Sequence, residues 1–179
     1  MGNEIVIRQA VIEDSEATAR LNFDTWETSF RGLVPDEWMN KRNVDQHISQ
    51  FQKRFAEFGF GGMHIAELDG KVLGFSDGGA TRDKSLPFDA ELYAIYVLKA
   101  HQGKGVGQTL FRAVVNKAAK DGFHSIIAKT FSTSPYRRFY ERQGGQIVPG
   151  YKEDWEAVGV KIPLVAFCWK DLAGVPDQG

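Results

Sequence analysis

Three glycines, Gly103, Gly105 and Gly107, form the part of the sequence best suited to ligand chemistry. They follow an almost wholly apolar run, Leu92 to Leu98, and precede a segment with the apolar spacing of a helix. Glycine adopts positive φ at low cost and lets a ligand approach the backbone closely. The first turn of a helix adds N–H groups without intrahelical partners and the positive end of the helix dipole. This order of strand, glycine loop and helix therefore predicts a phosphate-binding site.

Two of the common phosphate loops do not fit this segment. A Walker loop needs Gly, four residues and then Gly-Lys-Ser/Thr, and the sequence contains no such string. The dinucleotide fingerprint needs a third glycine where Gln108 stands, and an acidic residue at the end of the next strand, where Lys129 and Thr130 stand. A nicotinamide-binding protein is therefore disfavoured.

Residues 102–107, Q-G-K-G-V-G, resemble the Q/R-x-x-G-x-G/A motif of the GNAT family of N-acetyltransferases. Residues 139–144, F-Y-E-R-Q-G, are similar to the family's F-Y-x-x-x-G segment, and residues 92–98 to the strand before its loop. Residues 26–35 resemble the first-helix region of one bacterial branch of the family. These motifs cover the last half of the chain, and the order of elements covers the first half.

The resemblance implies a single α/β (α+β) domain over residues 1–173, followed by a flexible tail at 174–179. Its sheet would be mixed, mostly antiparallel, strongly twisted and of about seven strands, with helices on both faces. The implied activity is an acetyl-CoA-dependent N-acetyltransferase, in which a primary amine attacks the thioester directly in a ternary complex. The alternative is a domain that binds acetyl-CoA without transferring the acetyl group, as a sensor or an interaction module.

By this resemblance, the loop and the start of the following helix contact acetyl-CoA. Main-chain groups of Ile95 and Val97 would hold the pantetheine arm where their strand separates from the next one. Thr133 stands where the family often has Asn. Its hydroxyl can donate or accept one hydrogen bond, but it cannot form the bidentate hydrogen bonds of an amide. The pyrophosphate would be bound by main-chain groups of Gln102, Gly103, Lys104, Gly105 and Gly107, and Gln108 follows them as a further cofactor contact.

Tyr140 is implied as the acid that protonates the departing CoA thiolate. By spacing alone, Tyr136, Phe139 and Tyr140 also fit the core-facing stripe of a helix, so packing is the competing interpretation. Glu91, at the start of the strand before the loop, is the candidate base for the amine and would act through water. A solvated carboxylate at a strand end is the competing interpretation for Glu91.

The rest of the sequence predicts the elements that would position these residues. Strands are expected at residues 5–8, 63–68, 72–75, 92–98, 125–130, 146–148 and 161–170. Helices are expected from residues 14 or 15 to 32, at 44–58, from the glycine loop to 121, and at 135–143. The helix after the loop should bury Leu110, Phe111, Val114, Val115, Ala118 and Ala119.

The composition narrows the partners of the chain. Of 179 residues, 42% are hydrophobic and 25% are charged, as in a globular protein. Lys and Arg total 22 against 23 for Asp and Glu, which argues against nucleic acid or an anionic membrane as the main partner. The expected acceptor is a small-molecule or peptide amine, and Trp26, Phe30 and Trp38 could line its pocket or belong to the core. A homodimer is compatible with the resemblance.

Cysteine and histidine give little support for metal or redox chemistry. Cys168 is the only cysteine, so an internal disulfide and a zinc site of several thiolates are both excluded. The histidines show no metal-ligand spacing, and no metal is expected. No apolar run approaches the ~20 residues of a membrane helix, and the N-terminus lacks an apolar signal core. The expected location is the cytoplasm.

Overall fold

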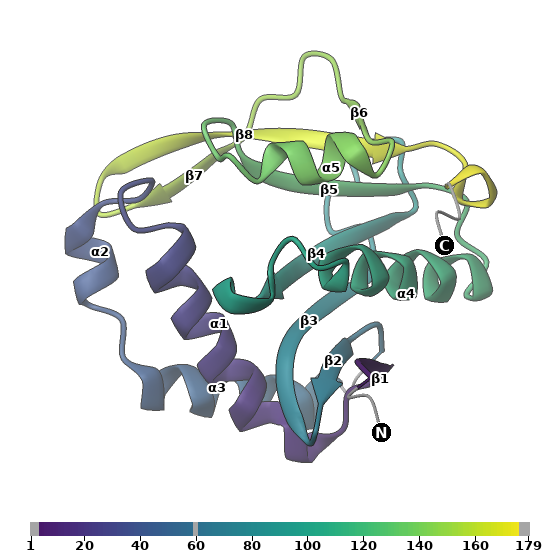
Figure 1. The fold of residues 1–179 in the computed structure, drawn as a ribbon. Helices are drawn as coiled ribbons and strands as arrows, with labels where there is room; N and C mark the ends of the chain where they lie inside the picture. Colours follow the sequence, from purple (N-terminus) through teal and green to yellow (C-terminus); the bar gives the residue numbers. More distant parts are fainter. Residues whose placement is uncertain (1–3, 59–60, 176–179) are drawn as a thin grey trace.

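Residues 4–58 and 61–175 are described by the computed structural model of the chain (Figure 1). The strands are β1 (Val6–Gln9), β2 (His64–Leu68), β3 (Lys71–Ala80), β4 (Ala90–Val97), β5 (Ile126–Phe131), β6 (Gln146–Ile147), β7 (Asp154–Ala157) and β8 (Val160–Trp169). Within the described residues they form one sheet in the order β1-β2-β3-β4-β5-β8-β6, and β7 pairs with β8. These pairs are antiparallel except β4 with β5, so the predicted mixed, mostly antiparallel sheet is confirmed.

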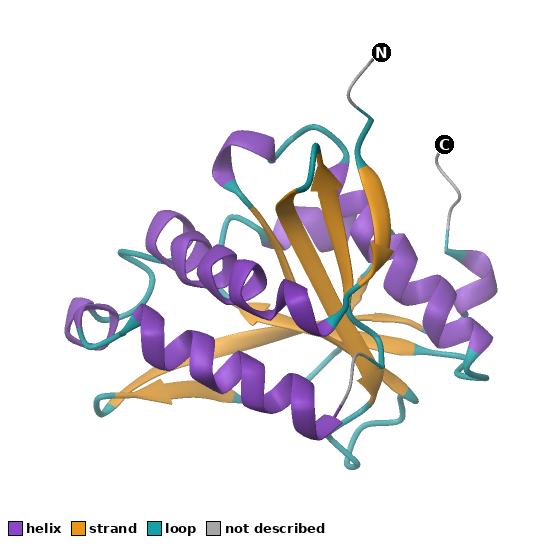
Figure 2. Ribbon diagram, turned by 90° about the horizontal axis from the view of Figure 1, so that it is seen from below, coloured by secondary structure: helices purple, strands orange, loops and turns teal. Residues whose placement is uncertain are grey.

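Helices cover both faces of the sheet, as predicted (Figure 2). The helices are α1 (Ser15–Ser29), α2 (Asp36–Asn40), α3 (Val44–Phe58), α4 (Val106–Lys120) and α5 (Arg137–Arg142). On one face, Leu21 of α1 and Phe55 of α3 pack against Ile65 and Phe75 of the sheet. On the other face, α4 and α5 pack around Phe111 against β4, β5 and β8. Each face therefore has its own apolar core.

The parallel pair β4–β5 is short and opens into a gap. The two strands pair only from Ala90 to Leu92, opposite residues 126–128, although both strands continue further. On the other side of β4, Asp77 faces Ala94 and Gly78 faces Leu92, so Tyr93 is an extra residue in β4. A bulge of this kind bends its strand and increases the local twist. The bulge at Tyr93 thus lies where β4 turns away from β5.

Strand β3 is longer than the sequence predicts. It runs to Ala80, whereas the expected strand ends at Phe75, because the glycines at 78 and 79 favour a turn over a strand. The structure gives the reason for Gly78: a Cβ there would lie 2.6 Å from Cγ1 of Val114 in α4. The glycine lets α4 lie close to the sheet, so it serves helix packing and not a turn.

A short strand and a short α-helix are among the elements absent from the sequence prediction. Strand β7 precedes a tight turn at Val158 and Gly159, which have φ of +49° and +75°. Valine is a poor turn residue, so the pattern gives no hairpin signal there. Helix α2 starts directly after Pro35, whereas no helix is expected between residues 32 and 44.

Two further expectations concern the ends of elements. The predicted stripe of α4 is buried except Ala119, which is exposed, so that part of the prediction is wrong. Ala119 lies in the last turn of α4, where Ala118 and Phe123 already fill the core. At the C-terminus a short 3-10 helix, Leu172–Gly174, buries Leu172. The flexible tail at 174–179 stays a prediction, and residues 176–179 lie outside the described range.

Candidate active site

A cleft of about 610 Å³ lies at the gap where β4 leaves β5, and we call it the glycine-loop cleft. Three parts of the chain that are distant in sequence form its walls: β4 with the following loop, α1, and α5. Of the predicted site residues, it is lined by Ile95, Val97, Gln102, Gly103, Gly105, Gly107, Gln108 and Tyr140. The sequence motifs thus converge on one concave site.

The glycine loop has the geometry of an anion site. Gly103 and Gly105 have φ of +73° and +84°, and Gly105 is the N-cap of α4. A Cβ at Gly107 would lie 3.3 Å from the ring of Phe139, so this glycine is needed for close packing of α5 on α4. Thr109 N–H donates to the carbonyl oxygen of Gly105 at 3.0 Å. The amides of the first helical turn precede this bond and have no acceptor within the helix. They suit a phosphate.

The main chain of β4 turns alternate residues toward the gap. Leu98 N–H donates to Leu73 O of β3 at 2.9 Å, which fixes one edge of β4 against β3. Because successive residues of a strand present their main-chain groups to opposite edges, Val97 and Ile95 present theirs to the gap. The Gln102 side chain donates to Val97 O at 2.9 Å from that side. The structure therefore offers a row of main-chain donors and acceptors along the gap.

Tyr140 of α5 lines the cleft and is buried. Its side chain is 8% exposed and stacks on Phe167 with ring centroids 5.4 Å apart. Burial raises the pKa of its phenol well above the ordinary value, so the hydroxyl keeps its proton at neutral pH. Tyr140 is thus both a core residue and a lining residue of the cleft, and the two interpretations of its spacing are compatible.

Lys104 and Thr133 lie outside the group that lines the cleft. Both side chains are exposed, Lys104 in the glycine loop and Thr133 in the turn after β5. A role for either residue in cofactor binding stays a prediction, and for Lys104 it would involve the main chain.

Glu91 of β4 lines a second cavity, of about 790 Å³, which we call the Glu91 cavity. Its residue is 1% exposed, so the interpretation as a solvated strand-end carboxylate is wrong. The carboxylate accepts hydrogen bonds from the Arg82 guanidinium at 2.5 and 3.2 Å and from the Arg82 main-chain N–H at 3.0 Å. Glu91 therefore anchors the chain after β3, and a role as base would require it to act from within this ion pair.

The glycine-loop cleft and the Glu91 cavity meet at the gap in the sheet. Both are lined by Tyr140, by Ile95 and Tyr96 of β4, and by Phe30 and Thr130. The Glu91 cavity also has an aromatic wall that includes Trp26, Phe131 and Trp155. A ligand in the cleft and a second ligand in the cavity could therefore reach each other beside Tyr140.

Two hydroxyl residues of α1 belong to the cleft although the sequence analysis does not single them out. Thr25 and Ser29 lie one helical turn apart and line the cleft. Their side-chain oxygens are buried and have no hydrogen-bond partner among the residues that the structure describes. A buried hydroxyl without a partner is costly, so these two groups suit a polar ligand. Their i, i+4 spacing is too common in helices to have predicted this.

The described part of the chain offers little support for a metal site, a membrane-spanning helix or a reactive cysteine. Among residues 4–58 and 61–175, no group of three His, Cys, Asp or Glu side chains is placed to hold a metal ion. No helix in the same ranges is long and apolar enough to cross a bilayer. Cys168 is buried in β8, and burial raises the pKa of its thiol, which favours the packing role expected from the sequence.

Fold and cleft together define a class of protein: an α/β protein with a glycine loop, suited to an anion, where two parallel strands separate. The model of the acetyltransferase (GNAT) family matches residues 23–145. The chain therefore belongs to the GNAT acetyltransferase family, as the motifs predict. A relative from Bacillus subtilis (strain 168), named as the uncharacterized N-acetyltransferase YuaI, is 27% identical over 172 residues, which are 96% of each chain.

Solved structures share the fold over nearly their whole length. An N-acetyltransferase from Staphylococcus aureus Mu50 has a TM-score of 0.71 at 18% identity, covering 94% of this chain and 99% of that one. The PaiA N-acetyltransferase from Thermoplasma acidophilum, in complex with coenzyme A, has a TM-score of 0.65 at 18% identity, covering 91% and 98%. YncA from Salmonella typhimurium, with acetyl-CoA, has a TM-score of 0.68 at 20% identity, covering 98% and 99%.

Proposed function

We propose that the protein transfers the acetyl group of acetyl-CoA to a primary amine, by direct attack in a ternary complex. The observation that carries this proposal is the gap in the sheet, which the glycine-loop cleft reaches from one side and the Glu91 cavity from the other. Two substrates that enter from opposite sides would meet beside Tyr140. Such positioning can supply much of the rate of a two-substrate reaction.

The cleft offers suitable groups for each part of acetyl-CoA. The loop amides from Gly103 to Gly107 would bind the pyrophosphate, and the β4 edge at Ile95 and Val97 would bind the pantetheine amides. The unpartnered hydroxyls of Thr25 and Ser29 face the same cleft and add two donors. The PaiA structure is a complex with coenzyme A and the YncA structure a complex with acetyl-CoA, which supports the same ligand here.

The chemistry of the step can be assigned to residues of this chain. Acetyl-CoA would supply the acetyl group as a thioester: a C–N bond to the amine forms, the C–S bond breaks, and CoA leaves as a thiolate. Main-chain N–H groups on the gap side of β4 would stabilise negative charge on the carbonyl oxygen as the amine attacks. Tyr140, which keeps its proton at neutral pH, would donate that proton to the departing sulfur. The proton lost by the amine would pass through water toward Glu91.

A second candidate function is an acetyl-CoA-binding sensor that does not transfer the acetyl group. The ion pair of Glu91 with Arg82 favours it, because a carboxylate engaged in this way is a poor base. A cytoplasmic location, an amine acceptor of small-molecule or peptide type, and a homodimer are further parts of the proposal for which the sequence alone gives support.

The test is a calorimetric titration of the purified chain with acetyl-CoA, with NAD as the control ligand. Binding of acetyl-CoA without binding of NAD is expected. Release of free CoA thiol on addition of primary amines would then support the enzyme, and binding without release would support the sensor. If acetyl-CoA does not bind, both functions are wrong.

A further inference from the structure

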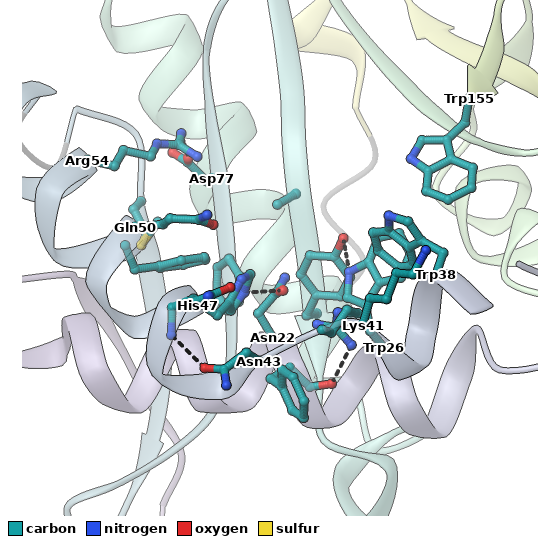
Figure 3. A pocket seen from close by; sticks show the side chains of 18 residues that line it. Asn22, Trp26, Trp38, Lys41, Asn43, His47, Gln50, Arg54, Asp77 and Trp155 are labelled. Atoms are coloured by element: carbon teal, nitrogen blue, oxygen red, sulfur yellow. Dashed lines mark hydrogen bonds and ion pairs between the residues drawn. The ribbon is translucent and has the colours of Figure 1, made fainter. Parts of the chain in front are cut away.

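A third cavity, of about 460 Å³, lies between α1, α3 and the sheet, and we call it the Arg42 cavity (Figure 3). It adjoins the Glu91 cavity, since Trp26, Ala94, Tyr96 and Trp155 line both. The proposed chemistry at the gap does not use it. A ligand that occupies the Glu91 cavity could therefore extend past Trp26 into this space.

The charged side chains of the Arg42 cavity are mostly cationic. Lys41, Arg42 and Arg54 line it, against a single carboxylate, Asp77. At one end Arg54 pairs with Asp77, as Figure 3 shows, so these two charges balance each other. Lys41 pairs with the carboxylate of Glu37 at 2.6 Å on an exposed surface. Arg42 is the remaining cation, and its positive charge determines the sign of the electrostatic potential in the cavity.

Arg42 is a buried cation with few compensating partners. Its side chain is 10% exposed, and Nη1 donates to the carbonyl oxygen of Phe23 at 3.2 Å. The carboxylate nearest to it is Glu27, whose Oε1 is 3.6 Å away. The other oxygen of Glu27 accepts from Arg31 at 2.5 Å, so this carboxylate is shared. Burial lowers the pKa of Arg42, and the negative charges of Glu27 and Asp24 oppose this shift.

Aromatic rings surround the same guanidinium. Its central carbon lies 4.4 Å from the ring centroid of Phe23, 5.5 Å from that of Trp26 and 5.7 Å from that of Trp38. These rings already hold one cation, so they are a poor place for the second cation of a diamine or polyamine. A carboxylate or a phosphonate, in contrast, could accept two parallel hydrogen bonds from the guanidinium.

We propose that the acceptor of this enzyme carries an oxyanion, a carboxylate or a phosphonate, at a distance from the amine, and that Arg42 binds it. The amine would lie at the gap beside Tyr140, and the chain between the two groups would pass Trp26 and Tyr96. Polar side chains on α1 and α3 complete the surroundings of the anion, including Asn22, whose Oδ1 is 2.8 Å from His47 Nε2 (Figure 3). This inference rests on the proposed function, since it names the substrate class of the same site.

The test compares straight-chain ω-amino acids of increasing length with n-alkylamines and diamines of the same length, and with ω-aminoalkylphosphonates. The readout is CoA thiol release, as kcat/KM. For the best length we expect the ω-amino acid or the phosphonate to exceed the alkylamine by roughly tenfold or more, the range of one charge-assisted contact. The diamine should be the poorest substrate. The class with the higher kcat/KM, carboxylates or phosphonates, identifies the oxyanion of the acceptor.

In Arg42→Gln, the ratio of kcat/KM for the anionic amine to kcat/KM for the neutral amine should fall to about one, chiefly through a higher KM for the anionic amine. Arg42→Lys should retain part of this ratio. Lys53→Gln removes an exposed cation of α3 outside the cavity and should keep the ratio. A preference for diamines, equal rates for all amines, or an unchanged ratio in a folded Arg42→Gln protein would overturn the proposal. If Arg42→Gln does not fold, the wild-type comparison alone decides.

Failure of the proposed function is distinguishable from failure of this inference. If no amine releases thiol although acetyl-CoA binds, transfer is wrong, and the anion site is then tested by calorimetry on the CoA-bound protein. The probes are ω-acetamido acids and N-alkylacetamides of the same length. Tighter binding of the acids, lost in Arg42→Gln, would support the anion site, and equal binding would refute it.

Discussion

Tyr140 combines a core position with access to two cavities. Its ring stacks on Phe167, while the glycine-loop cleft and the Glu91 cavity both reach it. Burial raises the pKa of its phenol, so the hydroxyl is protonated at working pH but is a weaker acid than an exposed tyrosine. This environment separates Tyr140 from Tyr136, which is half-buried and lines only the cleft.

Tyr140→Phe should lower kcat by roughly a hundredfold, a common size for loss of a general acid, with little change in acetyl-CoA affinity. The ring is retained, so its packing should persist. Stopped-flow thiol detection and calorimetry measure the two quantities. Tyr136→Phe is the matched control and should have a small effect. Equal losses of turnover and affinity in Tyr140→Phe would contradict the acid role.

Glu91 could act as a base, or it could only anchor the chain after β3 through Arg82, and substitution of each residue distinguishes these two roles. Both Glu91→Gln and Arg82→Gln disrupt the same ion pair, so both should lower the free energy of unfolding. If Glu91 is the base, only Glu91→Gln should lower kcat, by roughly a hundredfold. Denaturation and steady-state kinetics on the two variants decide this. If Glu91→Gln and Arg82→Gln have similar kcat values, Glu91 is not the base and only holds Arg82.

At the scale of elements, the glycine loop and the short β4–β5 pairing create the site. The sequence predicts both the loop and the strand before it, because glycine spacing and a continuous apolar run are local signals. It misses the far part of β3, where a glycine serves close packing against α4 and not a turn. It also misses β7, because the turn that follows this strand has a valine at positive φ. The contributions of Thr25, Ser29 and Arg42 depend on contacts between distant elements, which no local pattern reports.

Gly105→Ala should weaken acetyl-CoA binding by tenfold or more, because the N-cap at φ +84° would be strained and the loop amides displaced. The matched control is Gly122→Ala after α4, with φ +87°, an equally open Cβ position and no contact with the cleft. Both variants should lose about 1–2 kcal/mol of stability. Calorimetry and denaturation measure both effects, and equal affinity in the two variants would contradict a loop that binds the cofactor.

Asp14 joins β1 to α1, and its role predicts a dependence of stability on pH. Burial opposes ionisation, but hydrogen bonds from Arg8 at 2.8 and 2.9 Å and from Val11 N–H at 2.8 Å lower its pKa. A pKa lower in the folded than in the unfolded chain stabilises the fold above about pH 4, and this contribution is lost as pH falls through the folded value.

Asp14→Asn should therefore lower the free energy of unfolding by about 1.5–3 kcal/mol at pH 7, and the deficit should shrink at acid pH. The control Glu16→Gln removes an exposed i, i+4 pair with Arg20 and should cost at most about 0.5 kcal/mol. Urea denaturation at several pH values measures this. A deficit for Asp14→Asn that is independent of pH would contradict the ionic role.

At the scale of the whole molecule, the two faces of the sheet have different tasks. The face covered by α4 and α5 carries the glycine loop, whereas the face covered by α1 and α3 carries the Arg42 cavity. The gap between β4 and β5 joins them, so neither half of the chain makes the site alone. Family motifs concentrated in the second half predict the cofactor side, while the proposed acceptor side is built from the first half and from β7.

The most direct test of the central claim is a single-turnover reaction with protein in excess over acetyl-CoA. A primary amine is added, the reaction is stopped at set times, and free CoA and N-acetylated amine are quantified by mass spectrometry. We predict that both products appear together, in equal amounts and at the same rate. Acetyl-CoA that stays bound and intact with every amine, anionic or neutral, would contradict acetyl transfer and leave the sensor as the function of the cleft.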